Sequence, residues 1–184
     1  MMHAIQRMTK FDQFIHAQSD ALKELYHGGH IIPFLQVLYA TLDILGFVTA
    51  EDEKERPGVR FKDFVSKYMV AHLTDINASD LWGARCALLH TGTPESTESQ
   101  KGNAREVLYS WGTADSSLNR KVIGKSSTPH RYVAVTLEHL YDSMIDGLED
   151  LARELNINSP LNQRCIQRVD RFYEHVPVSK GSIV

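Results

Sequence analysis

The sequence predicts an all-α protein, an antiparallel bundle of about six helices that carries a small β-hairpin insertion. Apolar residues recur every three or four positions over most of the 184 residues, as they do on one face of a helix. The spacing changes to alternation only near residues 107–111. The content of 42% hydrophobic and 23% charged residues is typical of a globular chain, so we expect one domain spanning residues 1–184.

The first two helices are predicted at residues 5–26 and 33–48. Gly28 and Gly29 supply the stop of the first, and Pro33 fits the first turn of the second. The second is apolar around most of its circumference, which is typical of the central helix of a bundle. Residues 31–50 approach the length of a membrane span, but Asp43 there would cost about 3 kcal/mol in a bilayer. We therefore expect a buried core helix and no membrane segment.

The third helix is predicted at residues 61–73, after a polar stretch, and the fourth at about residues 80–90. Asn77, Ser79 or Asp80 can cap the start of the fourth, and Gly92 with Pro94 ends it. Residues 94–103 have the composition of a surface loop.

The alternation of apolar and polar residues at 107–111 predicts a short strand, and residues 121–123 are a candidate second strand after a turn-like stretch. These two segments make the predicted hairpin. Helical spacing returns from Leu137 to Leu155 as a long fifth helix. A sixth begins near Pro160, with Cys165, Val169, Phe172 and Tyr173 inward and with three arginines outward, Arg164, Arg168 and Arg171.

Bulk composition limits the class of protein. The first fourteen residues contain no continuous apolar stretch of the kind found in signal peptides, so we expect a cytoplasmic protein. Cys86 and Cys165 are the only cysteines and have no paired spacing, which argues against a disulfide framework. The net charge of -3 means that binding to nucleic acid would need a local basic patch.

Arg85 lies at the centre of an apolar helix face. The positions three and four residues away hold Leu81, Trp82, Leu88 and Leu89, so no carboxylate on the same helix can pair with it. His90 follows five residues later, at about 140° of rotation and about 7.5 Å of rise, so we expect that the two side chains do not meet within one helix.

The segment RCALLH, in which four residues separate Arg85 from His90, resembles the R-x4-6-H motif of HEPN domains, the higher eukaryotes and prokaryotes nucleotide-binding family. In that family the motif lies at the C-terminal end of a late core helix in an α-helical bundle, and the order of elements over residues 35–155 agrees. The resemblance implies an RNA-cleaving or RNA-binding protein. Cleavage would be metal-independent and without a cofactor, with Arg85 and His90 as catalytic residues. Cys86 stands where the family usually has a polar residue, often asparagine, whose hydrogen bonds a thiol cannot replace.

In many HEPN proteins two copies of the motif meet across a dimer, so the resemblance also implies a homodimer. It further implies a toxin or a defence component, with an antitoxin or another protein as partner. The residue types suit RNA cleavage, because histidine can move a proton and a guanidinium can stabilise charge on a phosphorane. The small residues Gly83, Cys86 and Ala87 form a stripe that would let a partner helix approach closely.

A different class of function is open. Arg85 can be the structural ion-pair partner of Asp43 or of another core-facing carboxylate in a non-catalytic helical interaction module, since a buried charge is costly when it is left alone. Cys86 and His90, four residues apart, have the spacing of a zinc pair, but no further ligands cluster nearby, so we expect no metal. His27 and His30 fit an ordinary helix stop better than a metal pair.

The segment from residue 101 to residue 131 is basic, with two acidic residues, Glu106 and Asp115, against six positive ones. Tyr109 and Trp111 are interleaved with these charges, so the segment is a candidate surface for following an RNA backbone and stacking a base. The alternative is a solvated hairpin whose aromatic residues face the core. The candidate substrate-binding residues are Lys101, Arg105, Arg120, Lys121, Lys125 and Arg131.

Overall fold

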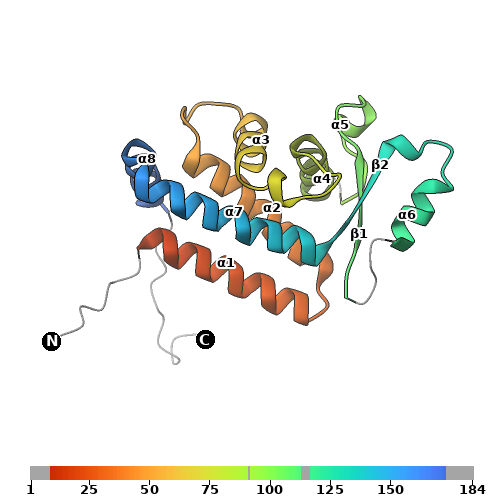
Figure 1. Ribbon diagram of the computed structural model, residues 1–184, viewed down its shortest axis with the longest axis horizontal. Coiled ribbons are helices and arrows are strands. Elements are labelled where there is room, and N and C mark those ends of the chain that lie inside the picture. Colours follow the sequence, from red (N-terminus) through yellow and green to blue (C-terminus); the bar gives the residue numbers. More distant parts are fainter. Residues whose placement is uncertain (1–8, 91, 113–116, 173–184) are drawn as a thin grey trace, which may run out of the picture.

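The computed structural model of the protein describes residues 9–90, 92–112 and 117–172. The chain is mostly helical, at 70% helix, with eight α-helices and a small two-stranded parallel sheet in the described part (Figure 1). The mostly helical fold is thus confirmed, while the β element has a different form from the one expected. The predicted helical residues 5–8 and the inward-facing Tyr173 lie outside the described residues.

The first four long helices lie close to the positions that the apolar pattern predicts. The side chain of Thr9 caps the first of them by accepting a hydrogen bond from the backbone N–H of Asp12. A short 3-10 helix, η1 (Val70–His72), takes the place of the last turn expected for the third helix. The helices are α1 (Lys10–His27), α2 (Ile31–Thr49), α3 (Pro57–Tyr68) and α4 (Ala78–His90).

Helix α2 is the centre of the fold and packs against α1, α3, α4 and α8 (Ser159–Val169). Leu38, Leu42 and Leu45 are fully buried along it. By length and composition α2 is also apolar enough to cross a membrane, but half of its apolar window is buried inside the protein. Its apolar circumference therefore matches the predicted central core helix.

Gly46 lets α2 and α3 approach closely. A Cβ at this position would lie 2.8 Å from the carbonyl oxygen of Arg60 and 3.0 Å from its carbonyl carbon, and backbone cannot move aside as a side chain can. We expect Gly46→Ala to lower the free energy of unfolding by about 1–3 kcal/mol, measured by urea denaturation. Gly124→Ala is the control, because its Cβ would meet nothing within 4 Å. Equal stability of the two variants would contradict this packing.

The two strands, β1 (Glu106–Ser110) and β2 (Tyr132–Thr136), pair in parallel, with Glu106 opposite Tyr132. The predicted hairpin is therefore wrong. Parallel strands need a crossover connection, and here it contains α6 (Ser117–Gly124) and η2 (Pro129–Arg131). Residues 121–123, expected as the second strand, lie in α6. The expected loop at residues 94–103 contains a short helix, α5 (Thr97–Gln100), capped by Ser96.

The C-terminal helices α7 (Leu137–Ile157) and α8 follow the predicted pattern, except at Arg168. This arginine was expected to face outward, yet it is only 6% exposed. Its Nη1 donates to the carbonyl oxygens of Phe47 at 2.7 Å, Val48 at 3.1 Å and Ala50 at 2.6 Å. Arg168 thus satisfies carbonyl groups that the end of α2 leaves without helical partners.

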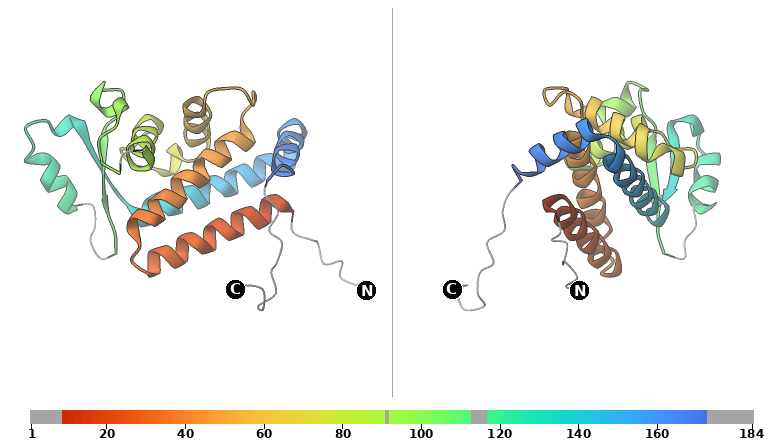
Figure 2. Two further views of the ribbon diagram at one scale, coloured as in Figure 1. Left: turned by 180° about the vertical axis from the view of Figure 1, so that it is seen from behind. Right: turned by 60° about the vertical axis from the view of Figure 1, so that its left-hand side comes forward.

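The small sheet and α6 lie together at the end of the helical body opposite α8 (Figures 1 and 2). Helix α6 packs against β2 and β1, and α4 packs against β1. On another face, α1 and α7 run side by side (Figure 2). This arrangement brings the predicted motif helix, α4, next to the predicted basic segment.

Candidate functional site

Arg85 on α4 receives its counter-charge from α2. Its Nε donates to Oδ2 of Asp43 at 2.7 Å, and its Nη2 lies 2.6 Å from the same oxygen. The guanidinium carbon also lies 5.2 Å from the ring centroid of Trp82. The Arg85 and Asp43 side chains are 17% and 22% exposed. The guanidinium is therefore held on two sides, by a carboxylate and by an aromatic face, but still reaches solvent.

His90 contacts the same guanidinium. Its Nε2 lies 2.9 Å from Nη1 of Arg85, and the histidine itself is exposed at the end of α4. The prediction that these side chains do not meet is wrong. The prediction considered only the directions in which the two side chains leave the helix. The arginine side chain is long enough to reach His90 in spite of the angle between those directions. Because a guanidinium only donates, Nε2 is the acceptor, and in the neutral ring the proton is on Nδ1.

Asp43, Arg85 and His90 thus form one hydrogen-bonded chain from a core helix to the surface. The one basic lone pair of neutral His90, on Nε2, accepts from Nη1 of Arg85, so it can take up a proton only when this hydrogen bond opens. Once Nε2 is protonated it no longer accepts from Nη1, and two positive groups then repel each other. Nη1 of Arg85 becomes available to an anion while Asp43 keeps the rest of the guanidinium in place. The arrangement can couple a proton transfer to the stabilisation of negative charge.

The small-residue stripe on α4 is covered by the same chain. A Cβ at Gly83 would lie 2.7 Å from Cβ of Ala104 and 3.4 Å from Oγ of Ser96, and Ala87 is 1% exposed. The expectation that this stripe offers close approach to a partner helix is therefore wrong. The missing side chain of Gly83 makes room for Ser96 and Ala104 of the same chain.

Cys86 is half-buried beside the site. Burial raises the pKa of its thiol, and the neighbouring Arg85 guanidinium only partly offsets this. We expect native Cys86 to react with a thiol reagent at neutral pH several-fold more slowly than an exposed cysteine peptide, because only the thiolate is nucleophilic. Mass spectrometry of the time course measures the rate.

The Cys86→Ala variant is the control for that labelling, since it retains Cys165, which is 3% exposed with its pKa raised by burial to about 11. Labelling of Cys86 faster than the peptide would instead identify an activated thiolate.

Two of the predicted substrate-binding residues have partners within the fold. Arg105 pairs with Asp80, with 2.7 Å between Nη2 and Oδ2, and Arg131 pairs with Glu106 at 2.9 Å and Glu95 at 3.4 Å. The other four are exposed and form no ion pair with another described residue, namely Lys101, Arg120, Lys121 and Lys125. The basic surface open to a ligand is thus centred on α6 and the residue that follows it.

The two interleaved aromatic residues differ in placement. Tyr109 points into the protein, where its hydroxyl lies 2.5 Å from that of Tyr39, and burial raises the pKa of both. It has the core-facing role of the alternative interpretation. Trp111 is 50% exposed and remains available to a ligand.

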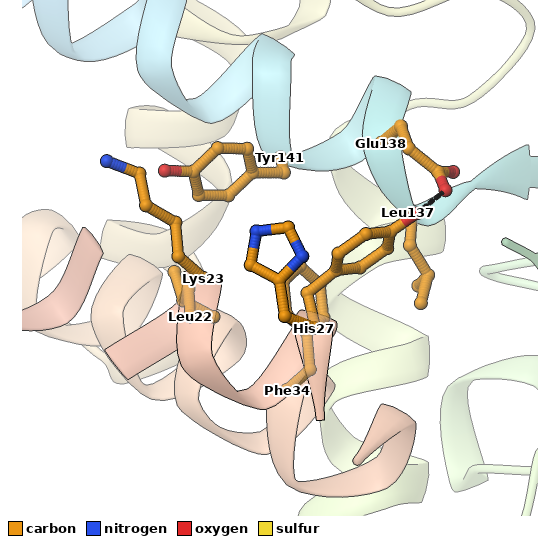
Figure 3. A pocket seen from close by; sticks show the side chains of 8 residues that line it. Leu22, Lys23, His27, Phe34, Leu137, Glu138 and Tyr141 are labelled. Atoms are coloured by element: carbon orange, nitrogen blue, oxygen red, sulfur yellow. Dashed lines mark hydrogen bonds between the residues drawn. The ribbon is translucent and has the colours of Figure 1, made fainter. Parts of the chain in front are cut away.

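A small pocket lies between α1 and α7, with a cavity volume of about 160 Å³. Figure 3 shows Lys23 and His27 from α1 opposite Glu138 and Tyr141 from α7. A cavity of about 150 Å³ holds a single benzene ring, so this pocket is too small for a nucleotide. Sequence reasoning missed it because its walls come from segments more than a hundred residues apart, with no local pattern.

Within the described part of the chain, no group of three or more His, Cys, Asp or Glu residues has the arrangement of a metal site. Comparison of the chain with protein-family models, with curated proteins and with solved structures finds no match.

Proposed function

We propose that the protein is a HEPN-like, metal-independent endoribonuclease that acts as a homodimer. The observation that carries the proposal is the contact of 2.9 Å between His90 and Arg85, with Arg85 anchored on Asp43. It places a proton acceptor next to a fixed positive charge at the surface. The resemblance of RCALLH to the HEPN motif supports the same chemistry, and a toxin or defence role agrees with it.

In this mechanism Nη1 of Arg85 first moves from Nε2 of His90 to an oxygen of the substrate phosphate. The freed Nε2 then accepts the proton of a ribose 2′-hydroxyl while the 2′-oxygen bonds to the adjacent phosphorus. Arg85 stabilises the negative charge that develops on the phosphorane oxygens. The bond from phosphorus to the 5′-oxygen then breaks, and this oxygen receives a proton from the protonated His90 of a second copy. The products are a 2′,3′-cyclic phosphate and a free 5′-hydroxyl.

The products test the reaction. We expect the purified protein to cut single-stranded or loop RNA in excess EDTA, and mass spectrometry of the fragments to find 2′,3′-cyclic phosphate and 5′-hydroxyl ends. Fragments with 3′-hydroxyl and 5′-phosphate ends, or cleavage that requires a divalent metal, would exclude a reaction of this kind.

The homodimer is a separate prediction. A second copy supplies the protonated histidine, so the site is incomplete in one protomer. Light scattering at tens of micromolar protein should give about twice the chain mass of 20.8 kDa. A mass near that of one chain would remove both the dimer and the second proton donor.

A second candidate is a non-catalytic helical interaction module, and the ion pair between Arg85 and Asp43 favours it. Removing one partner of such a pair leaves the other charge poorly compensated, so the residues can be kept for stability alone. In this case Arg85 has a structural role and His90 is a surface residue. The absence of cleavage over varied RNA substrates would favour this function.

A further inference from the structure

A groove of about 620 Å³ lies between the start of α2 and strand β1, at the end of the molecule that carries α6. We call it the α2–β1 groove. Ile32 and Pro33 line one side, and Val107 and Leu108 line the other. Trp111 and Asn119 also border the groove. The remaining lining residues are Gly29, His30, Ile31, Leu35 and Tyr109. The groove is much larger than the pocket between α1 and α7 and has room for a nucleobase with its sugar.

Trp111 supplies an exposed aromatic face next to an anchored backbone position. The ring is 50% exposed, and nearby Ile32 is 54% exposed. The next residue, Gly112, is anchored, because its backbone N–H donates to Oε1 of Glu138 at 2.6 Å and Glu138 also accepts from the Tyr26 hydroxyl, the bond drawn in Figure 3. A large aromatic surface left in solvent on an anchored backbone is suited to stacking a base.

Asn119 supplies a polar group without a partner among the described residues. Its Nδ2 is buried and makes no hydrogen bond to any residue that the structure describes, although Asn119 borders the groove. Leaving a buried donor unpaired is costly, and most such groups in proteins are satisfied. An amide that both donates and accepts is able to pair with the edge of a base.

The segment that contributes Asn119 to the groove carries exposed positive charges. Arg120, Lys121 and Lys125 are exposed, and residues 117–131 contain no aspartate or glutamate. These cations complement phosphate groups, while Trp111 and Asn119 complement a base. The side of α2 that lines the groove includes Leu35, and Asp43 lies eight residues further along that helix, about 12 Å away. This is roughly the length of three or four stacked nucleotides.

We propose that the α2–β1 groove binds a base of single-stranded RNA, stacked on Trp111 and hydrogen-bonded to Asn119, with α6 holding the flanking phosphates. The inference rests on the proposed function for the class of ligand. It adds that the substrate is recognised as an unpaired strand at a subsite separate from the cleavage residues.

Binding is tested on the full chain carrying His90→Ala, in which RNA cleavage is slowed by about 10² to 10⁴. Fluorescence anisotropy measures the affinity for a labelled short oligouridine. An abasic oligonucleotide of the same length is the control ligand. Trp111→Ala should weaken oligouridine binding by about 5- to 150-fold and leave abasic binding nearly unchanged. Trp111→Phe should restore part of the loss. Leu118→Ala should change little, because Leu118 is an exposed apolar residue on α6, at 62%, that does not border the groove.

The contribution of the basic residues is tested by measuring RNA affinity at several salt concentrations. Replacing Arg120, Lys121 and Lys125 by alanine should reduce the slope of log affinity against log salt by up to about 2, and Asn119→Ala should change the preference among the four homopolymers and not this slope.

Three outcomes would overturn the subsite. These are equal loss of oligouridine and abasic binding in Trp111→Ala, no loss in either, or loss of self-association in that variant, which would show that the groove holds a second copy. Cleavage by a chain that passes none of the binding tests removes the subsite and leaves the proposed function. If binding depends on Trp111 but the wild-type chain never cleaves RNA, the subsite is kept and the proposed function is rejected.

Discussion

Asp80→Ala is expected to lower the free energy of unfolding by about 3 kcal/mol. Asp80 is 1% exposed, and it accepts hydrogen bonds from the Arg105 backbone N–H at 2.7 Å and from the Asn77 backbone N–H at 3.1 Å. Its ion pair with Arg105 would also be lost, leaving the guanidinium and these donors without their acceptor. Breaking a buried pair costs about 3–5 kcal/mol, and the 34% exposure of the Arg105 side chain places the effect at the lower end.

For a chain of this length the expected decrease in Tm is about 6–12 °C, measured by circular dichroism. Glu95→Ala is the matched control. It removes an ion pair of 3.4 Å with Arg131 in which both side chains are more than 40% exposed, so its effect should stay below about 1 kcal/mol. Equal changes in Tm for the two variants would mean that Asp80 does not tie α4 to the start of β1.

The helices were predictable because their signals are local. Apolar spacing and caps placed α2 and α7 within a few residues, since these signals reflect the helical repeat and the unpaired groups at helix ends. The parallel sheet was not predictable in this way. Strand alternation shows that β1 is a strand, but its partner β2 begins 26 residues after β1 does, across α6. The short segment at 121–123 was equally compatible with a strand and with a helix.

The contacts of two arginines were likewise not predictable from local sequence patterns. The spacing of Arg168 on α8 is that of a solvent-facing residue, and only tertiary structure shows that it binds carbonyl groups 118–121 residues earlier in the chain. At the candidate site, sequence reasoning singled out Arg85 and His90 and named Asp43 as a possible partner of Arg85. It did not predict the contact between Arg85 and His90, because helical rotation describes where side chains begin and not how far an arginine reaches.

His90→Ala is expected to decrease the rate of RNA cleavage by about 10² to 10⁴. The substitution removes the group that accepts the 2′-hydroxyl proton. It leaves the pair between Asp43 and Arg85 in place, and His90 is exposed, so the Tm should change by no more than a few degrees. Arg85→Ala is a less informative variant because it also removes a partly buried ion pair.

The central claim, that the Asp43–Arg85–His90 chain is a catalytic site, is tested most directly by one paired rate measurement. Wild type and His90→Ala, matched in concentration and shown to be folded, are incubated with the same single-stranded RNA in excess EDTA, and the initial rates of appearance of 2′,3′-cyclic phosphate ends are compared. The account predicts rapid formation by wild type and a rate at least 100-fold lower for the variant. Equal rates, or no product from either protein across varied RNAs, would contradict it.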